Sequence, residues 1–426
     1  MSLFTIITTL VVITALFAYI NSRVLKLPAT IGIMIVSLIF SLLLIGAGFF
    51  FPAISIFAED FITDIDFSKV LLDVMLSFLL FAGALHTDSS LLKANRRSIG
   101  VFAILGVILS TLLVGVFFYF IFQLFPTPVN FWYCLLFGAL VAPTDPIAVL
   151  GILTKAGAPK DLEIKIVGES LFNDGIGVVL FLSLLEIISI GTANITFTDI
   201  GVLLVQEIGG GILFGWLLGL AGYYMMKRID DYQSEVMITL GMVMGGYFMA
   251  QYLHLSGPLA MVVAGLFTGS RSVSMAMSDT TELYVFKFWE LIDVLMNAIL
   301  FVLIGLEILT LDFNMNYLLA GLIAIPVTLL ARFLALLIPS QIFKRYIHTD
   351  LKMIKVMTWG GLRGGLSIAM ALSLSYPLPK TQFMFMIYVV VLFSIIVQGL
   401  TVGKLIKKLI IPKPATSVAS NNPENL

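Results

Sequence analysis

The chain has 426 residues, of which 60% are hydrophobic and only 12% are charged, and its formal net charge is −1. A soluble domain carries about 25% charged residues because its surface has to be polar, so this composition excludes a soluble globular protein. The single cysteine, Cys134, excludes an intramolecular disulfide bond.

Thirteen apolar runs follow one another along the chain and predict an all-α membrane protein with about thirteen transmembrane helices. A helix needs about 20 mostly apolar residues to span a bilayer, and only the ninth run is clearly short. The first run has no basic residues before it and no cleavage site after it, so we expect a retained helix rather than a signal peptide. The runs cover roughly residues 3–20, 28–51, 70–86, 98–125, 131–153, 164–191, 199–226, 234–253, 256–270, 284–311, 316–343, 353–377 and 382–404.

Loops rich in Lys and Arg alternate along the chain with loops that have almost none. Of the 24 basic residues, 20 fall on one side of the predicted membrane, and the opposite loops hold only Lys69 and Lys380. Because cytoplasmic loops are the basic ones, we expect the N-terminus outside and the C-terminus in the cytoplasm. Residues 1–405 are predicted to form one transmembrane domain, and the short tail at 406–426 is predicted to be disordered.

Two of the predicted helices contain residues that break helices. The fifth contains Pro-Thr-Asp-Pro at 143–146, and the twelfth contains Gly-Gly-Leu-Arg-Gly-Gly at 360–365. Unwound backbone inside a bilayer is tolerated only where it faces protein or water, and a broken helix in each half is typical of a transporter site. A simple kink is the alternative, but Asp145 and Arg363 at the centres of the breaks each need a partner or a function.

The sixth predicted helix carries two adjacent polar faces. Ser170 and Asp174 lie four residues apart and share one face, while Glu169 and Asn173 share the next. A hydroxyl and a carboxylate one turn apart suit a hard cation, which prefers oxygen ligands, and the broken fifth helix offers further oxygens. The candidate ligands of a cation are therefore Asp174, Asp145, Thr144 and Ser170.

The charged side chains near the predicted membrane centre sum to one negative charge. Asp145, Glu169 and Asp174 are acidic, whereas Arg332 and Arg363 are the two basic residues inside helices. One monovalent cation or one proton would neutralise the remainder, and a carboxylate removed from water binds a proton more readily, so the two ions can compete for one site. Other acids lie toward helix ends and are interpreted as interfacial or pairing residues: Glu186, Glu207, Asp293 and Glu307.

These segments resemble the signature sequences of NhaP-type sodium/proton antiporters, the electroneutral branch of the monovalent cation:proton antiporter family. The resemblance is carried by residues 143–146, by Glu-Ser-Leu-Phe-Asn-Asp-Gly at 169–175 and by Gly-Leu-Arg-Gly at 361–364, and it covers about residues 5–405. It implies an NhaA-like inverted-repeat fold in which the two broken helices cross near the ion site. It also implies a homodimer whose core domains move like elevators.

The resemblance implies a role for each matching residue. Asp174 matches the aspartate that binds the ion and the proton, and the neighbouring Asn173 either contacts the ion or holds the broken helix. The family pattern departs at Ala82, where related proteins often carry an acidic residue. The other matches are Thr144, Asp145 and Ser170 as ligands of Na⁺, Glu169 and Arg332 as a buried ion pair, and Arg363 as the arginine of the second broken helix.

We therefore interpret the chain as a secondary transporter of the cell (inner) membrane that exchanges sodium or lithium for protons 1:1, for pH and sodium homeostasis. A potassium/proton antiporter of the same family is the alternative. A cation channel would need a filter or rings of charge, an enzyme a G-x-S-x-G or H-E-x-x-H motif, and an ATP-driven pump a phosphate loop, and none of these patterns occurs. We expect no cofactor besides the transported ions, and no nucleic-acid partner.

Overall fold

The computed structural model describes residues 2–51, 53, 61–62, 65–123, 129–190, 197–270, 277–311, 313–347, 349–375 and 378–410. Within these ranges the chain is helical, and its one isolated β-bridge joins Asp145 to Leu362. The predicted all-α class is therefore confirmed. Residues 406–409 continue the last helix, whereas 411–426, the rest of the predicted tail, lie outside the described residues.

The elements follow the chain in this order: α1 (Leu3–Ile20), η1 (Asn21–Leu25), α2 (Ala29–Phe50), α4 (Phe67–Lys69), η2 (Val70–Met75), α5 (Leu76–Leu85), α6 (Ser89–Phe122), α7 (Phe131–Val141), α8 (Ile147–Ala156), α9 (Lys160–Ile190), α10 (Phe197–Met226), α11 (Tyr232–Tyr252), α12 (Gly257–Thr268), α14 (Asp279–Leu306), η3 (Glu307–Thr310), α15 (Met315–Ile342), α16 (Leu351–Gly360), α17 (Gly365–Leu372), α18 (Lys380–Phe393), η4 (Ser394–Gln398) and α19 (Gly399–Leu409). Nine helical spans in the described ranges are long and apolar enough to cross a membrane. The helices α7, α8, α11, α12, α16 and α17 fall outside that set.

Polar side chains fix the starts of the helices that surround the site. The Asp88 carboxylate accepts hydrogen bonds from the main-chain N–H groups of Ser90 and Leu91 at the start of α6. The Ser278 hydroxyl accepts one from Thr281 N at the start of α14. Each bond satisfies a donor that the first helical turn leaves unpaired. The helices therefore begin at defined residues on the side of the basic loops.

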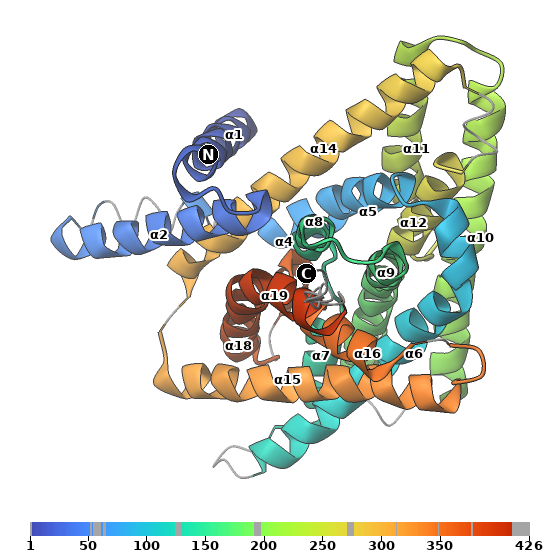
Figure 1. The fold of residues 1–426 in the computed structure, drawn as a ribbon. Coiled ribbons are helices and arrows are strands. Elements are labelled where there is room, and N and C mark those ends of the chain that lie inside the picture. The colour runs from blue at the N-terminus through green and yellow to red at the C-terminus, as the bar shows by residue number, and fades with distance from the viewer. Residues whose placement is uncertain are drawn as a thin grey trace, which may run out of the picture.

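The long helices lie around a centre of shorter ones. Figure 1 shows α10, α14 and α15 at the periphery, with α7, α8 and α16 between them. Helix α12 packs against both α10 and α5, and α2 packs against α14. At Gly265 in α12 a side chain would collide with the main chain of Phe81, so glycine allows α12 to approach α5 closely.

Both predicted helix breaks are present, and they meet each other. Helix α7 ends at Val141 and α8 begins at Ile147, whereas α16 ends at Gly360 and α17 begins at Gly365. The Asp145 N–H donates to the Leu362 carbonyl at 2.7 Å, which forms the isolated β-bridge. We call the two unwound segments, residues 142–146 and 361–364, the crossing.

Candidate functional site

Arg363 holds the crossing together from its centre. This buried side chain donates to the carbonyl oxygens of Ala142 and Pro143, the latter at 2.8 Å, and its main-chain N–H donates to the Ser394 hydroxyl at 2.9 Å. The carbonyls at the end of α7 have no partners within the helix, and a positive charge stabilises that end of a helix. The predicted arginine therefore acts on the other broken helix rather than on its own.

Asp145 lies against the start of the second half-helix. A side chain at Gly364, the residue before α17, would place its Cβ 2.7 Å from Asp145 Oδ2. Only glycine therefore leaves space for the carboxylate at this position. The N-terminus of α17 carries a partial positive charge, which favours an anionic group beside it.

Asn173 links α9 to the crossing through both ends of its amide. Its Nδ2 donates to Thr144 Oγ1 at 2.7 Å and to Glu169 Oε1 at 2.9 Å, and its Oδ1 accepts from Thr144 N at 3.2 Å. The hydroxyls of Thr144 and Ser170 lie 3.0 Å apart. Of the two roles that the sequence left open for Asn173, these contacts correspond to holding the broken helix.

Glu169 and Arg332 form a buried ion pair between α9 and α15. The two guanidinium NH groups donate to the two carboxylate oxygens at 2.7 and 2.5 Å, and the side chains are 1% and 2% exposed. Such a bidentate pair fixes both position and orientation. The contact implied by the family resemblance is present in the structure.

A cavity of about 350 Å³ lies beside the crossing. Its walls come from α5, α9, α14 and the crossing, and its lining includes Asp145, Asp174 and Asp293. Asp88 and Glu163, at the starts of α6 and α9, are exposed and partly exposed, so we take this end of the cavity as its mouth. Because Asp174 lies three turns beyond Glu163 on α9, it is about 16 Å deeper along that helix axis. The mouth therefore lies on the side of the basic loops.

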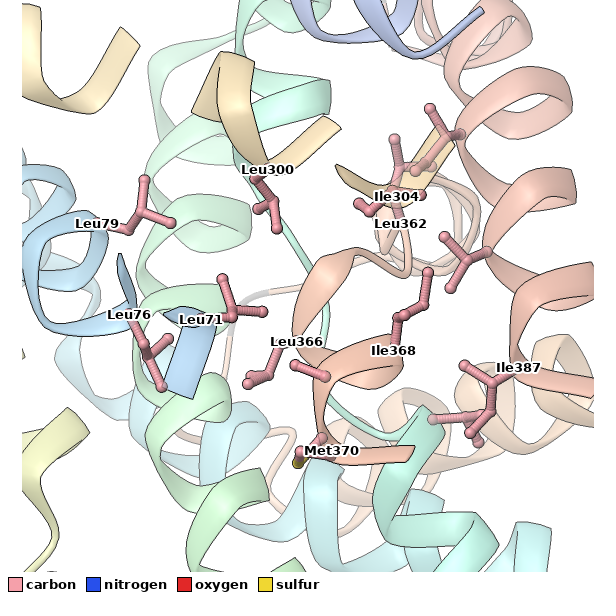
Figure 2. Close-up of a cluster of buried hydrophobic side chains, with 14 of the residues drawn as sticks. Leu71, Leu76, Leu79, Leu300, Ile304, Leu362, Leu366, Ile368, Met370 and Ile387 are labelled. Atoms are coloured by element: carbon pink, nitrogen blue, oxygen red, sulfur yellow. The ribbon is translucent and has the colours of Figure 1, made fainter. Parts of the chain in front are cut away.

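Buried leucines form the other end of the cavity. Leu71 and Leu76 lie at the end of the η2–α5 segment remote from the mouth, and Leu300 and Leu366 come from α14 and α17. Figure 2 shows them grouped between these elements. We call these four residues the leucine layer. It separates the carboxylates from the opposite side of the protein.

The four predicted cation ligands divide into two pairs in this structure. Asp145 and Asp174 line the cavity. Thr144 and Ser170 are 0% and 1% exposed, lie off the cavity lining and are hydrogen-bonded to each other. Ala82 is fully buried and lies off the cavity lining, to which Leu79, Leu80 and Gly83 of the same helix contribute. Residue 82 therefore faces away from the cavity here.

Asp293 is the site residue that the sequence interpretation missed, because it was taken for an interfacial or pairing acid. It lines the cavity from α14, and Asn297 Nδ2 donates to its Oδ1 at 3.0 Å. Residues 293, 297 and 300 are spaced four and three apart, which places them on one helix face. That spacing is the signal that could have identified it. Within the described ranges, no three His, Cys, Asp or Glu residues gather closely enough to hold a metal ion.

Known proteins resemble this chain along almost its whole length. The sodium/hydrogen exchanger family, in its transmembrane region, matches residues 11–408. The chain is 45% identical to the Na(+)/H(+) antiporter NhaP of Pseudomonas aeruginosa over 95% of this chain and 96% of that protein. It is 34% identical to the Na(+)/H(+) antiporter NhaH of Halobacillus aidingensis over 91% of this chain and 93% of that protein.

The fold is also found among solved structures. The sodium proton antiporter MjNhaP1 from Methanocaldococcus jannaschii superposes with a TM-score of 0.76. The superposition covers 96% of this chain and 99% of that one, at 22% sequence identity.

Proposed function

Because the chain belongs to the sodium/hydrogen exchanger family, as an NhaP-type member, we propose that it exchanges sodium or lithium ions for protons across the cell (inner) membrane. The observation that carries the proposal is the placement of Asp145 and Asp174 beside the crossing, deep in a cavity that ends at the leucine layer. An ion can reach these carboxylates from one side only. A site that is open to one side at a time is what coupled exchange requires.

We assign the bound sodium ion to Asp174 and Asp145, with Ser170 and Thr144 supplying further oxygens. The two hydroxyls bond to each other at 3.0 Å on the residues next to Asp145 and one turn before Asp174, so a change of rotamer would turn them toward an ion. Carboxylate, hydroxyl and carbonyl oxygens are the ligands that hard cations prefer. A proton on Asp174 takes the place of the sodium ion, since either one neutralises the same charge.

The test is a pH gradient imposed on everted membrane vesicles that contain the protein. Added sodium should dissipate the gradient, and vesicles without the protein should keep it. Lithium and potassium added in turn test the alternative of a potassium/proton antiporter, because oxygen ligands of this kind accept each of these ions. A response to potassium alone would favour that alternative.

We further propose thirteen membrane crossings in residues 1–405, arranged as NhaA-like inverted repeats. In this arrangement the α7–α8 and α16–α17 pairs each cross once, and α11 and α12 add to the nine long spans. Two features support it: α5 and α14, the third and tenth crossings, line the same cavity, and each half contains one broken helix. The N-terminus lies outside, the tail at 406–426 is cytoplasmic, and two copies form a homodimer.

A further inference from the structure

The leucine layer is built from two groups of helices. Helix α14 packs against α2, α5 and α11, whereas α17 packs against α7 and α18. We call the first group the α14 bundle and the second the α17 bundle. Leu71, Leu76 and Leu300 belong to the α14 bundle, and Leu366 belongs to the α17 bundle. An ion can therefore leave on the side opposite the mouth only if Leu366 separates from the other three leucines.

Tyr388 joins the same two bundles beyond the leucine layer. It lies on α18 and is 3% exposed, and its hydroxyl donates to the Ile304 carbonyl of α14 at 3.0 Å. Ile304 follows Leu300 by one helical turn, so this hydrogen bond lies about 6 Å farther from the mouth along α14. Figure 2 shows Ile304, together with Ile387 next to Tyr388, in the same buried cluster as Leu300. The bond thus spans the two bundles on the side that the leucine layer closes.

Hydroxyl groups of α2 also bond to the end of α14. The Ser37 hydroxyl donates to the Val302 carbonyl at 2.8 Å, and the Ser41 hydroxyl donates to the Gly305 carbonyl at 2.9 Å. A side chain at Gly305 would collide with Ser37, so the two helices approach each other closely. Both serines lie within the α14 bundle. Their bonds can persist when the two bundles part, whereas the bond from Tyr388 cannot.

We propose that Tyr388 is a positioning residue that biases the ion site toward the side of the mouth, by holding the two bundles together beyond the leucine layer. The inference rests on the proposed exchange, in which the site opens to each side in turn. Because α17 and α18 pack together, movement of Leu366 away from Leu300 also draws the Tyr388 hydroxyl away from its acceptor. The bond therefore stabilises the state that faces the mouth and is absent from the state that faces the opposite side.

The test compares the two sides of the membrane in Tyr388→Phe. A hydrogen bond that exists in only one of two states shifts the equilibrium between them about 2- to 10-fold. The apparent affinity for sodium on each side follows the fraction of protein that faces that side. Everted vesicles measure the half-maximal sodium concentration on the side of the mouth, and right-side-out vesicles measure it on the opposite side. The ratio of the opposite-side value to the mouth-side value should fall about 2- to 10-fold in the variant.

Two variants serve as matched controls. Ser37→Ala removes a bond of the same kind from α14, but within one bundle, so it should lower the melting temperature in detergent and leave the ratio unchanged. Tyr317→Phe makes the same chemical change as Tyr388→Phe, on α15 beside Phe385 of α18. The Tyr317 hydroxyl bonds to no described residue, so this variant should match the wild type in both measurements.

Two results would overturn the role of Tyr388 alone. One is an unchanged ratio in Tyr388→Phe, even with a lower melting temperature, because the tyrosine would then be purely structural. The other is an equal fall of the ratio in Ser37→Ala, whose bond does not cross between the bundles. A wild type without sodium-dependent pH recovery in either kind of vesicle would instead overturn the proposed exchange, and the role of Tyr388 with it.

Discussion

At the scale of single residues, the site separates the groups proposed to bind the ion from those that hold them in place. Asp145 and Asp174 line the cavity, whereas Asn173 and Arg363 make hydrogen bonds to the crossing. The first pair can change occupancy without breaking these bonds. We therefore expect substitutions in the two groups to have different effects.

Asp174→Asn should abolish exchange and leave the protein folded. The amide has nearly the shape of the carboxylate but neither binds a proton nor attracts sodium, so the exchanged charge is gone. Sodium-dependent pH recovery in vesicles measures the first effect, and elution and thermal melting in detergent measure the second. Glu290→Gln is the control, because Glu290 is exposed and pairs only with Lys287 within the described chain. Normal recovery in Asp174→Asn would contradict the site assignment.

Gly364→Ala should impair both stability and exchange. Its methyl group would meet the Asp145 carboxylate at 2.7 Å, so either the crossing or the carboxylate must shift. Overpacking of this kind costs about 1–3 kcal/mol, which should appear as a lower melting temperature in detergent. Gly100→Ala is the matched control, since nothing lies within 4 Å of an added Cβ there. If both variants melt and exchange alike, the close approach of Asp145 to residue 364 is wrong.

At the scale of elements, the Glu169–Arg332 pair joins α9 to α15. Removal of one partner leaves the other charged, buried and unpaired, which costs about 3–5 kcal/mol. Glu169→Ala and Arg332→Ala should therefore each lower thermal stability, and the double variant should lose less than their sum. The exposed Lys287–Glu290 pair serves as a control, and its removal should change stability little. Strict additivity at positions 169 and 332 would speak against the contact.

The breaks in α7–α8 and α16–α17 could be predicted because their causes are local. Proline removes a donor and glycine loosens the backbone, so residues 143–146 and 360–365 break a helix whatever surrounds them. That Glu169 and Asn173 share one face of α9 followed in the same way from helical spacing, and in the structure the two side chains are hydrogen-bonded.

Contacts between distant segments could not be predicted in this way. That α14 faces the same cavity as α9, and that Asp293 therefore belongs to the site, depends on how helices separated by a hundred residues pack. The direction in which residue 82 points has the same origin: α5 turns Gly83 to the cavity and Ala82 away from it. Neither hydropathy nor spacing contains this information.

At the scale of the whole molecule, five charges meet around the crossing. Three of them are the carboxylates of Asp145, Glu169 and Asp174, and the other two are the guanidinium groups of Arg332 and Arg363. These groups act on one another electrostatically. The sum of these charges is one negative charge, and Asn173 beside Asp174 adds none because it is neutral. One sodium ion or one proton therefore completes the balance.

Exchange should accordingly be electroneutral, with one sodium ion for one proton. A cycle that moved one net charge would respond to voltage, because 100 mV is worth about 2.3 kcal/mol per elementary charge. Proteoliposomes with a potassium diffusion potential of either sign measure this. Equal sodium gradients at the end point under both signs are expected. A shift of the end point with voltage would mean that a further acid joins the cycle.

The hydrogen bonds within the crossing also bear on how much of the driving ion gradient is lost through uncoupled leakage. Arg363 donates a hydrogen bond to the Pro143 carbonyl just after α7, and the Asp145 N–H donates one to the Leu362 carbonyl. Unwinding of either half-helix would therefore break its bonds to the other. We therefore expect these bonds to oppose slippage of an unoccupied site to the opposite face by partial unwinding. Weakening of these bonds should accordingly let one ion move downhill without driving the other uphill.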